Sequence, residues 1–180
     1  MLSTRDLPQN DALPKELKHK IKKSINDDKP FKLRRIIEEQ AISYDVEMGA
    51  RGSRWNVLHF CAKHNSWNCL HYLLRTHYQL LEEEYQAFVN LKTVEGYTPI
   101  VVAIINRAHK ALEVFLGYGG IDIHVIDGNK MTPYEIALNY KNDTAIRLLM
   151  SYESTSKKKH YLNRKALMEP IILESSDRCC

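Results

Sequence analysis

Six side chains of the kinds that bind metal ions fall between residues 59 and 77. A structural zinc ion needs four such ligands to converge, usually from Cys-x₂₋₄-Cys and His-x₃₋₅-His spacings. The two cysteines of this stretch are eight positions apart, on two segments that we expect to form antiparallel helices. Their spacing does not favour a metal site, and we predict neither a metal ion nor any other cofactor. The six residues are His59, Cys61, His64, Cys69, His71 and His77.

Two other segments match fragments of catalytic motifs outside the context that those motifs need. Ser154–Lys157 fits S-x-x-K, but it falls in a polar stretch with no scaffold to hold it. The glycine-rich run Gly117–Gly120 ends a predicted helix, whereas a phosphate-binding loop opens one. We therefore predict a helix C-cap and a turn at this run, and we predict that the chain is not an enzyme.

Composition and charge narrow the function classes further. With 180 residues, 44% of them hydrophobic, the chain suits one soluble domain with short tails. Its net charge of +4 is too mild to imply nucleic-acid binding. The N-terminal residues contain no apolar signal-peptide core, and the longest aliphatic run, Ile100–Ile105, is too short to span a bilayer. The cysteine pattern is typical of a reducing compartment, so we expect the protein to be cytoplasmic. The lysine run Lys157–Lys159 resembles a nuclear-import signal, so a nuclear location is the alternative.

The elements that position these residues follow an internal repeat. Gly96-Tyr97-Thr98-Pro99-Ile100 belongs to a block that recurs as Lys130-Met131-Thr132-Pro133-Tyr134. The two threonines are 34 positions apart, and so are the two prolines. A self-similar block at this period predicts a stack of repeated units.

Apolar residues at positions i, i+3 and i+4 predict the longer helix of each unit. A shorter apolar helix precedes each of these triplets, and no such unit can bury its apolar stripe alone. Between units, residues 89–93 and 121–125 alternate in polarity and lead into Glu95-Gly96 and Asp127-Gly128. We predict an all-α solenoid of about three to four helix-turn-helix repeats with short β-hairpin fingers. The triplets are Leu33/Ile36/Ile37, Leu70/Leu73/Leu74, Leu112/Phe115/Leu116 and Ala145/Leu148/Leu149.

These residues resemble the ankyrin-repeat family, whose motif is G-x-T-P-L-H-x-A. Gly96, Thr98, Pro99 and Ala103 match it in one copy. An earlier copy, Leu58–Ala62, keeps Leu-His-x-small-Ala but lacks Thr-Pro. The resemblance implies a protein-interaction module with a concave inner face, made of finger tips and first helices. It also implies that the imidazole of His59 ties neighbouring loops together.

The period divides the chain into four regions. We expect a disordered N-terminus over 1–13, a capping or divergent repeat over 14–49 and ankyrin repeats over 50–152. A basic linker, a cap helix and a tail are expected over 153–180. Asn56 and Thr98 are 42 positions apart, and the surplus falls at Thr76–Phe88. This insertion is either an extended second helix or a long finger loop, and either functional or a harmless extension.

Mapping the motif onto the chain gives eight candidate partner-binding residues. Large or polar side chains exposed on the inner face are candidates for binding hot spots, and ordinary packing between repeats is the alternative for each. Three of them should lie near finger bases, namely Trp55, Tyr97 and Met131. The other five should line the inner face, namely Phe60, His64, Val102, Asn106 and Asn139.

A narrower resemblance concerns the block Glu95–Pro99 with Thr132–Ala137. It is similar to late repeats of inhibitor-of-κB proteins, and the short length resembles the truncated, vankyrin-type homologues of polydnaviruses. The resemblance implies a monomer that binds Rel-family (NF-κB) transcription factors and suppresses host immune signalling. The alternative is an ankyrin adaptor or effector with another protein partner, attached to a membrane through Cys179 and Cys180 in one version.

Overall fold

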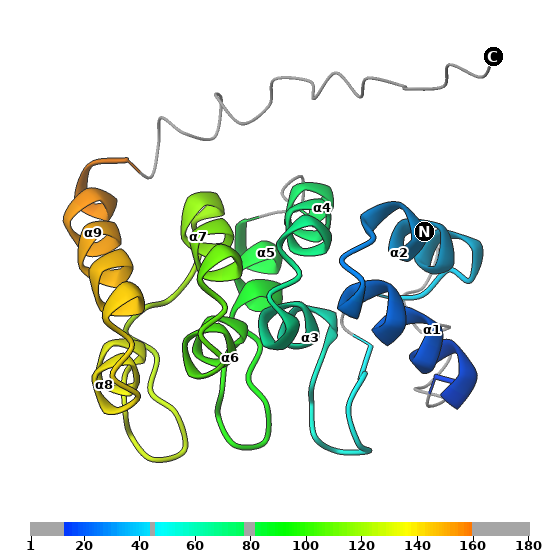
Figure 1. Ribbon diagram of the computed structural model, residues 1–180, viewed down its shortest axis with the longest axis horizontal. Helices are drawn as coiled ribbons and strands as arrows, with labels where there is room; N and C mark the ends of the chain where they lie inside the picture. The colour runs from blue at the N-terminus through cyan, green and yellow to red at the C-terminus, as the bar shows by residue number, and fades with distance from the viewer. Residues whose placement is uncertain (1–12, 44–45, 78–81, 160–180) are drawn as a thin grey trace, which may run out of the picture.

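The structure, a computed structural model, describes residues 13–43, 46–77 and 82–159. Within these ranges the backbone forms nine helices and no strand, arranged as a row of antiparallel pairs (Figure 1). The helices are α1 (Lys15–Asn26), α2 (Pro30–Glu39), α3 (Val57–His64), α4 (Trp67–His77), α5 (Glu82–Val89), α6 (Pro99–Ile105), α7 (His109–Tyr118), α8 (Pro133–Asn139) and α9 (Asp143–Lys159).

Four helix pairs stack in the order of the chain, and this confirms the predicted all-α solenoid. The first helices α1, α3, α6 and α8 pack in one row, and the second helices α2, α4, α7 and α9 pack in another. The apolar triplets lie between these rows: Leu70, Leu73 and Leu74 are fully buried. One continuous core therefore runs through all four pairs, because each pair buries its stripe against the next.

Capping residues set where the first helices begin. Thr132 and Glu135 form a reciprocal capping box at α8, and Asn56 and His59 form one at α3. The Thr98 hydroxyl does not cap α6 in the same way. Val101 stands where the other helices have His59 and Glu135, and the buried Thr98 Oγ1 makes no hydrogen bond. Pro99 occupies the first helical position, where it leaves no N–H to satisfy.

The fingers are tight loops rather than the predicted β-hairpins. Each closes through a backbone bond, such as Thr93 N to Tyr97 O at 2.9 Å and Asp127 N to Met131 O at 3.0 Å. Neighbouring fingers are also joined, because Gly128 N donates to Glu95 O at 3.0 Å. A Cβ on Gly96 would lie 2.7 Å from Gly128 N, so only glycine permits this approach.

The insertion forms a separate helix, so neither sequence-based alternative was right. α4 ends at His77 and α5 begins at Glu82, on the far side of four residues outside the described ranges. Tyr85 and Val89 of α5 are buried in the core, and the Tyr85 ring lies against Gly120. The insertion therefore packs against the stack as a structural element.

The last helix is longer than predicted. We expected a linker from residue 153, but α9 continues to Lys159 without a break. Residues 1–12 of the N-terminus expected to be disordered over 1–13, and the cap helix and tail expected beyond residue 159, lie outside the described residues. No helix in the described ranges is both long and apolar enough to cross a membrane.

Candidate protein-interaction surface

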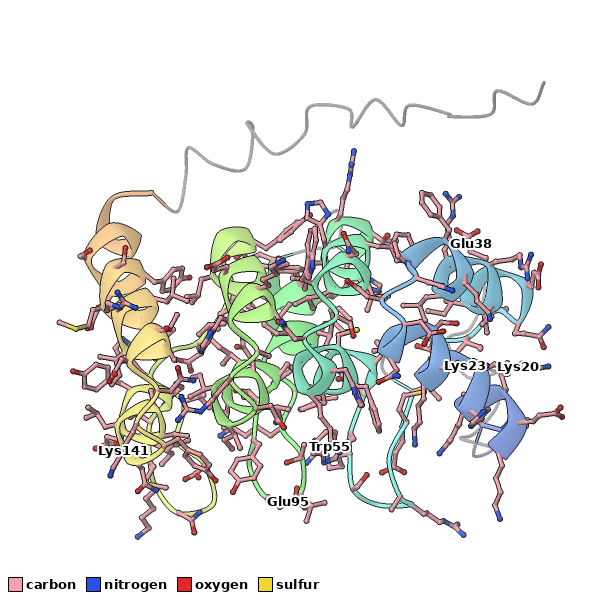
Figure 2. The ribbon with its side chains drawn as sticks, in the orientation of Figure 1. Lys20, Lys23, Glu38, Trp55, Glu95 and Lys141 are labelled. Carbon is pink, nitrogen blue, oxygen red and sulfur yellow. The ribbon has the colours of Figure 1, made fainter. Side chains whose placement is uncertain are left out.

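Three of the predicted residues come together where α3 meets the first finger, which is the loop of residues 48–55. The rings of Trp55 and Phe60 meet edge to face with centroids 5.5 Å apart. His64, one helical turn beyond Phe60, stacks on the Phe60 ring at 6.5 Å. All three keep part of their surface exposed, and Trp55 lies below α3 beside the fingers (Figure 2). Trp55 was predicted near a finger base and Phe60 and His64 on the inner face, and the structure places the three side by side; their part in binding stays a prediction.

Two lysines that sequence reasoning missed complete this group. Lys22 of α1 places its ammonium 4.6 Å from the centroid of Phe60. Lys63 of α3 places its own 5.8 Å from the centroid of Trp55. Both distances fall within the range of cation–π attraction. We call Lys22, Lys63, Trp55, Phe60 and His64 the lysine–aromatic cluster.

The cluster carries positive charge that the described chain does not neutralise. Burial, followed by the charges of Lys18 and Lys63, lowers the pKa of Lys22. Burial and then Lys63 also lower the pKa of His64. Neither Lys22 nor Lys63 lies within ion-pair distance of a described carboxylate. The nearby Glu47 accepts instead from the backbone N–H groups of its own finger, including Arg54 at 2.7 Å.

His59 joins this cluster to the next finger, as the family resemblance implied. Its ring lies 5.7 Å from that of Trp55. Nδ1 accepts from Asn56 N–H at 3.2 Å, which leaves Nε2 to donate to the backbone oxygen of Tyr97 at 3.1 Å. Burial lowers the pKa of His59 to about 4, outweighing the hydrogen bonds that favour its charged form. A neutral imidazole therefore fixes the base of the finger that carries Tyr97.

The remaining candidates do not join the cluster. Val102 is 2% exposed and packs in the core, so its predicted place on the exposed inner face was wrong. Its position on a short helix between α3 and α8 leaves it no solvent-facing side. Asn106 is exposed at the end of α6, where its amide donates to Val102 O at 2.8 Å. Met131 is half-buried in the third finger, and Asn139 is exposed at the end of α8.

The side chains considered as metal ligands are buried or pack against neighbouring residues. Cys61 and Cys69 are fully buried, and burial raises the pKa of both thiols. His71 lies against Tyr118 of α7, with ring centroids 5.3 Å apart. Within the described ranges no three His, Cys, Asp or Glu side chains converge in a way that could hold a metal ion.

One of the two missed lysines, Lys22, had a signal in the sequence. Lys18 and Lys22 are four positions apart on a predicted helix, so both lie on one side of it. That spacing is also common on solvated helix faces. Only the packing of α1 against α3 shows that this side faces Phe60.

A stack of helix pairs with loop fingers defines a class of repeat proteins, and comparisons with known proteins place the chain within it. The family model of ankyrin repeats, in three copies, matches residues 33–127, which is more than half of the 180-residue chain. The chain therefore belongs to the ankyrin-repeat family, and its repeats make it a protein–protein interaction module.

Two curated relatives match part of this chain. Mouse Rabankyrin-5 is 34% identical over 71 residues, which is 39% of this chain and 6% of that protein. The target of rapamycin complex 2 subunit AVO2 of Saccharomyces cerevisiae is 30% identical over 87 residues, 46% of this chain and 20% of that protein. The chain thus spans a small part of either relative's length.

Among solved structures, the fold recurs in a crystal structure of the yeast ribosomal protein Rps3 with its chaperone Yar1. The matched chain has a TM-score of 0.66 and 19% identity. The match covers 78% of this chain and 96% of that chain. At this identity the likeness shows the fold alone.

Proposed function

We propose that the chain is a non-enzymatic binding module that holds a protein partner on the inner face of its first two repeats. The observation that carries this proposal is the lysine–aromatic cluster, where Trp55 and Phe60 remain partly exposed beside ammonium groups that pair with no described carboxylate. Partly exposed aromatic rings beside cations have the composition of binding hot spots. The ankyrin family membership supports the same role, because the module binds proteins through this kind of surface.

The most specific candidate partner is a Rel-family transcription factor. The support is the resemblance of Glu95–Pro99 and Thr132–Ala137 to late inhibitor-of-κB repeats. In the structure these segments form the second finger with the start of α6, and the first turns of α8. An inhibitor of this kind would act as a monomer in the cytoplasm or nucleus, occupy the Rel protein and block the immune response of a host cell.

A pull-down with a purified Rel homology domain tests this function. We expect the full chain to retain the domain at micromolar concentration, and Trp55→Ala with Phe60→Ala to lose it. Phe31→Ala is the matched control, because Phe31 is 67% exposed on α2, away from the cluster. The absence of any retention by the unmodified chain would overturn the Rel assignment. Equal losses in the cluster variant and the Phe31 variant would overturn the proposed surface.

The second candidate is an adaptor with another protein partner. One relative is by name a subunit of a larger complex, and this favours an assembly role. Affinity purification from host cells, with the same cluster variant and control, distinguishes the two candidates by the partner recovered. Attachment to a membrane through Cys179 and Cys180, which lie outside the described residues, is tested by the intact mass of protein made in eukaryotic cells. An unmodified mass rules it out.

A further inference from the structure

We propose that the lysine–aromatic cluster recognises an acidic polypeptide segment, one rich in aspartate or glutamate. This inference rests on the proposed function and names the chemistry of the partner. It starts from three ammonium groups that lie close together. Lys22 has Lys18 and Lys63 near enough to affect its protonation, and no described carboxylate pairs with Lys22 or Lys63.

The charge extends along the helix that carries Lys22. α1 contains five lysines and one histidine but only one acid, Glu16. The first finger adds the exposed residues Arg51 and Arg54. Two finger acids are also present: Glu47 accepts from the N–H of Gly52 and interacts with the charge of Lys18, and Glu95 accepts from Thr93. An incoming carboxylate therefore meets a surface on which positive charges outnumber negative ones.

The aromatic rings favour a polypeptide over a nucleic acid. Binding of single-stranded nucleic acid relies on aromatic faces on which bases stack. Here Lys22 lies over Phe60, Lys63 lies over Trp55 and His64 stacks on Phe60. A base would have to displace a cation from a ring. A carboxylate can pair with the same ammonium groups while they stay in place.

The arrangement also orients the lysines before a partner arrives. A free lysine side chain loses rotamer freedom when it is ordered in a complex. Attraction to the rings limits that freedom in advance, and Lys18 is held in addition by the backbone oxygen of Gly49 at 3.4 Å. The cluster thus presents fixed cations beside apolar surface.

Fluorescence anisotropy with a labelled peptide of alternating glutamate and glycine tests the inference. The same peptide with glutamine in place of glutamate, and a labelled oligouridylate, serve as comparison ligands. We expect the glutamate peptide to bind, the glutamine peptide not to bind, and binding to weaken as ionic strength rises.

Charge-matched variants separate the cluster from general attraction. We expect Lys22→Gln with Lys63→Gln to weaken peptide binding roughly tenfold. Lys20→Gln with Lys23→Gln removes the same charge from exposed positions of α1 outside the cluster (Figure 2), and should weaken binding less than the cluster variant does. No binding of the glutamate peptide, equal losses in both double variants, or tighter binding of the oligouridylate would each overturn the inference.

The failure of this inference and that of the proposed function give different results. A partner protein that depends on Trp55 and Phe60 but binds equally well to the Lys22/Lys63 variant would leave the binding module intact and remove the acidic chemistry. If the peptide binds through the two lysines but no protein partner depends on Trp55 and Phe60, the acidic chemistry stands and the proposed binding module falls.

Discussion

At the scale of the residue, His59 couples the stability of the stack to pH. Its ring is neutral in the folded chain because burial lowers its pKa from 6.5 to about 4. The unfolded chain takes up a proton as pH falls below 6.5, but the folded chain does not until about 4. Folding is therefore stabilised fully above pH 6.5 and loses that stabilisation as pH falls towards 4, by roughly 3 kcal/mol in total.

We expect urea titrations of the wild-type chain between pH 7 and pH 4 to show this loss, and His59→Gln to flatten the slope. The variant will also be less stable at pH 7, because it loses the bonds to Asn56 and Tyr97. A smaller slope in the same direction should remain from His64 and His71, whose pKa values burial also lowers. His124→Gln, at an exposed finger position, is the control, and an equal flattening there would contradict the assignment.

Gly96 shows at the same scale how one backbone position holds two repeats together. Both Gly96 and Gly52 have positive φ, at 83° and 81°, so an alanine strains the backbone at either site. Only Gly96 also lies against its neighbour, since its Cβ would meet Gly128 N at 2.7 Å, whereas Gly52 has open space. We expect Gly52→Ala to cost about 1 kcal/mol and Gly96→Ala clearly more, measured by chemical unfolding. Equal costs would show that the contact between fingers adds nothing.

At the scale of the element, the turns between paired helices also bind the neighbouring pair. Asp28 follows α1, and its carboxylate accepts from Cys69 N–H at 2.9 Å and from Asn68 N–H at 3.3 Å. It thus caps the first turn of α4 from another repeat. Asn65 acts similarly one repeat later, accepting from Ala111 N–H at 3.0 Å. The first and second helix pairs therefore each complete the hydrogen bonding of the next pair.

We expect Asp28→Ala to lower the free energy of unfolding by about 1–2 kcal/mol, because it uncaps α4 and removes a bond between repeats. Asp27→Ala is the matched control, since Asp27 is the exposed residue directly before it. Thermal unfolding followed by circular dichroism measures both. A loss in the Asp27 variant as large as that in the Asp28 variant would place the effect in local turn geometry instead.

The repeat elements were predictable, and the elements that depart from the repeat were not. A 34-residue period gave the helix pairs, since each copy supports the interpretation of the next. α5 has no second copy, so its eight residues carried no period, and its burial depends on Gly120 thirty-odd positions away. Trp55, Phe60 and His64 lie in a copy of the repeat, so the motif could assign each of them to a face. Lys22 could not, because its partner ring lies on another helix.

At the scale of the whole molecule, the described stack ends on an apolar face. In the third helix pair, Ile100 and Ile104 are fully buried under α8. The residues 34 positions later, Tyr134 and Leu138, are partly exposed, and so is Met150 of α9. Terminal repeats of solenoids normally carry a polar outer face. This chain keeps apolar residues on the outer face of its last described pair. The contribution of equivalent positions to the free energy of unfolding therefore depends on their place in the stack.

Equivalent substitutions at the two positions test this dependence. Ile104→Ala removes buried methyl groups from a fully buried site and should cost about 2–5 kcal/mol. Leu138→Ala removes a side chain that is 50% exposed, and should cost less than about 1 kcal/mol. Urea unfolding of the full chain gives both values. If Leu138→Ala costs as much as Ile104→Ala, then the face at α8 and α9 is covered in solution, and the last described pair behaves as an internal repeat.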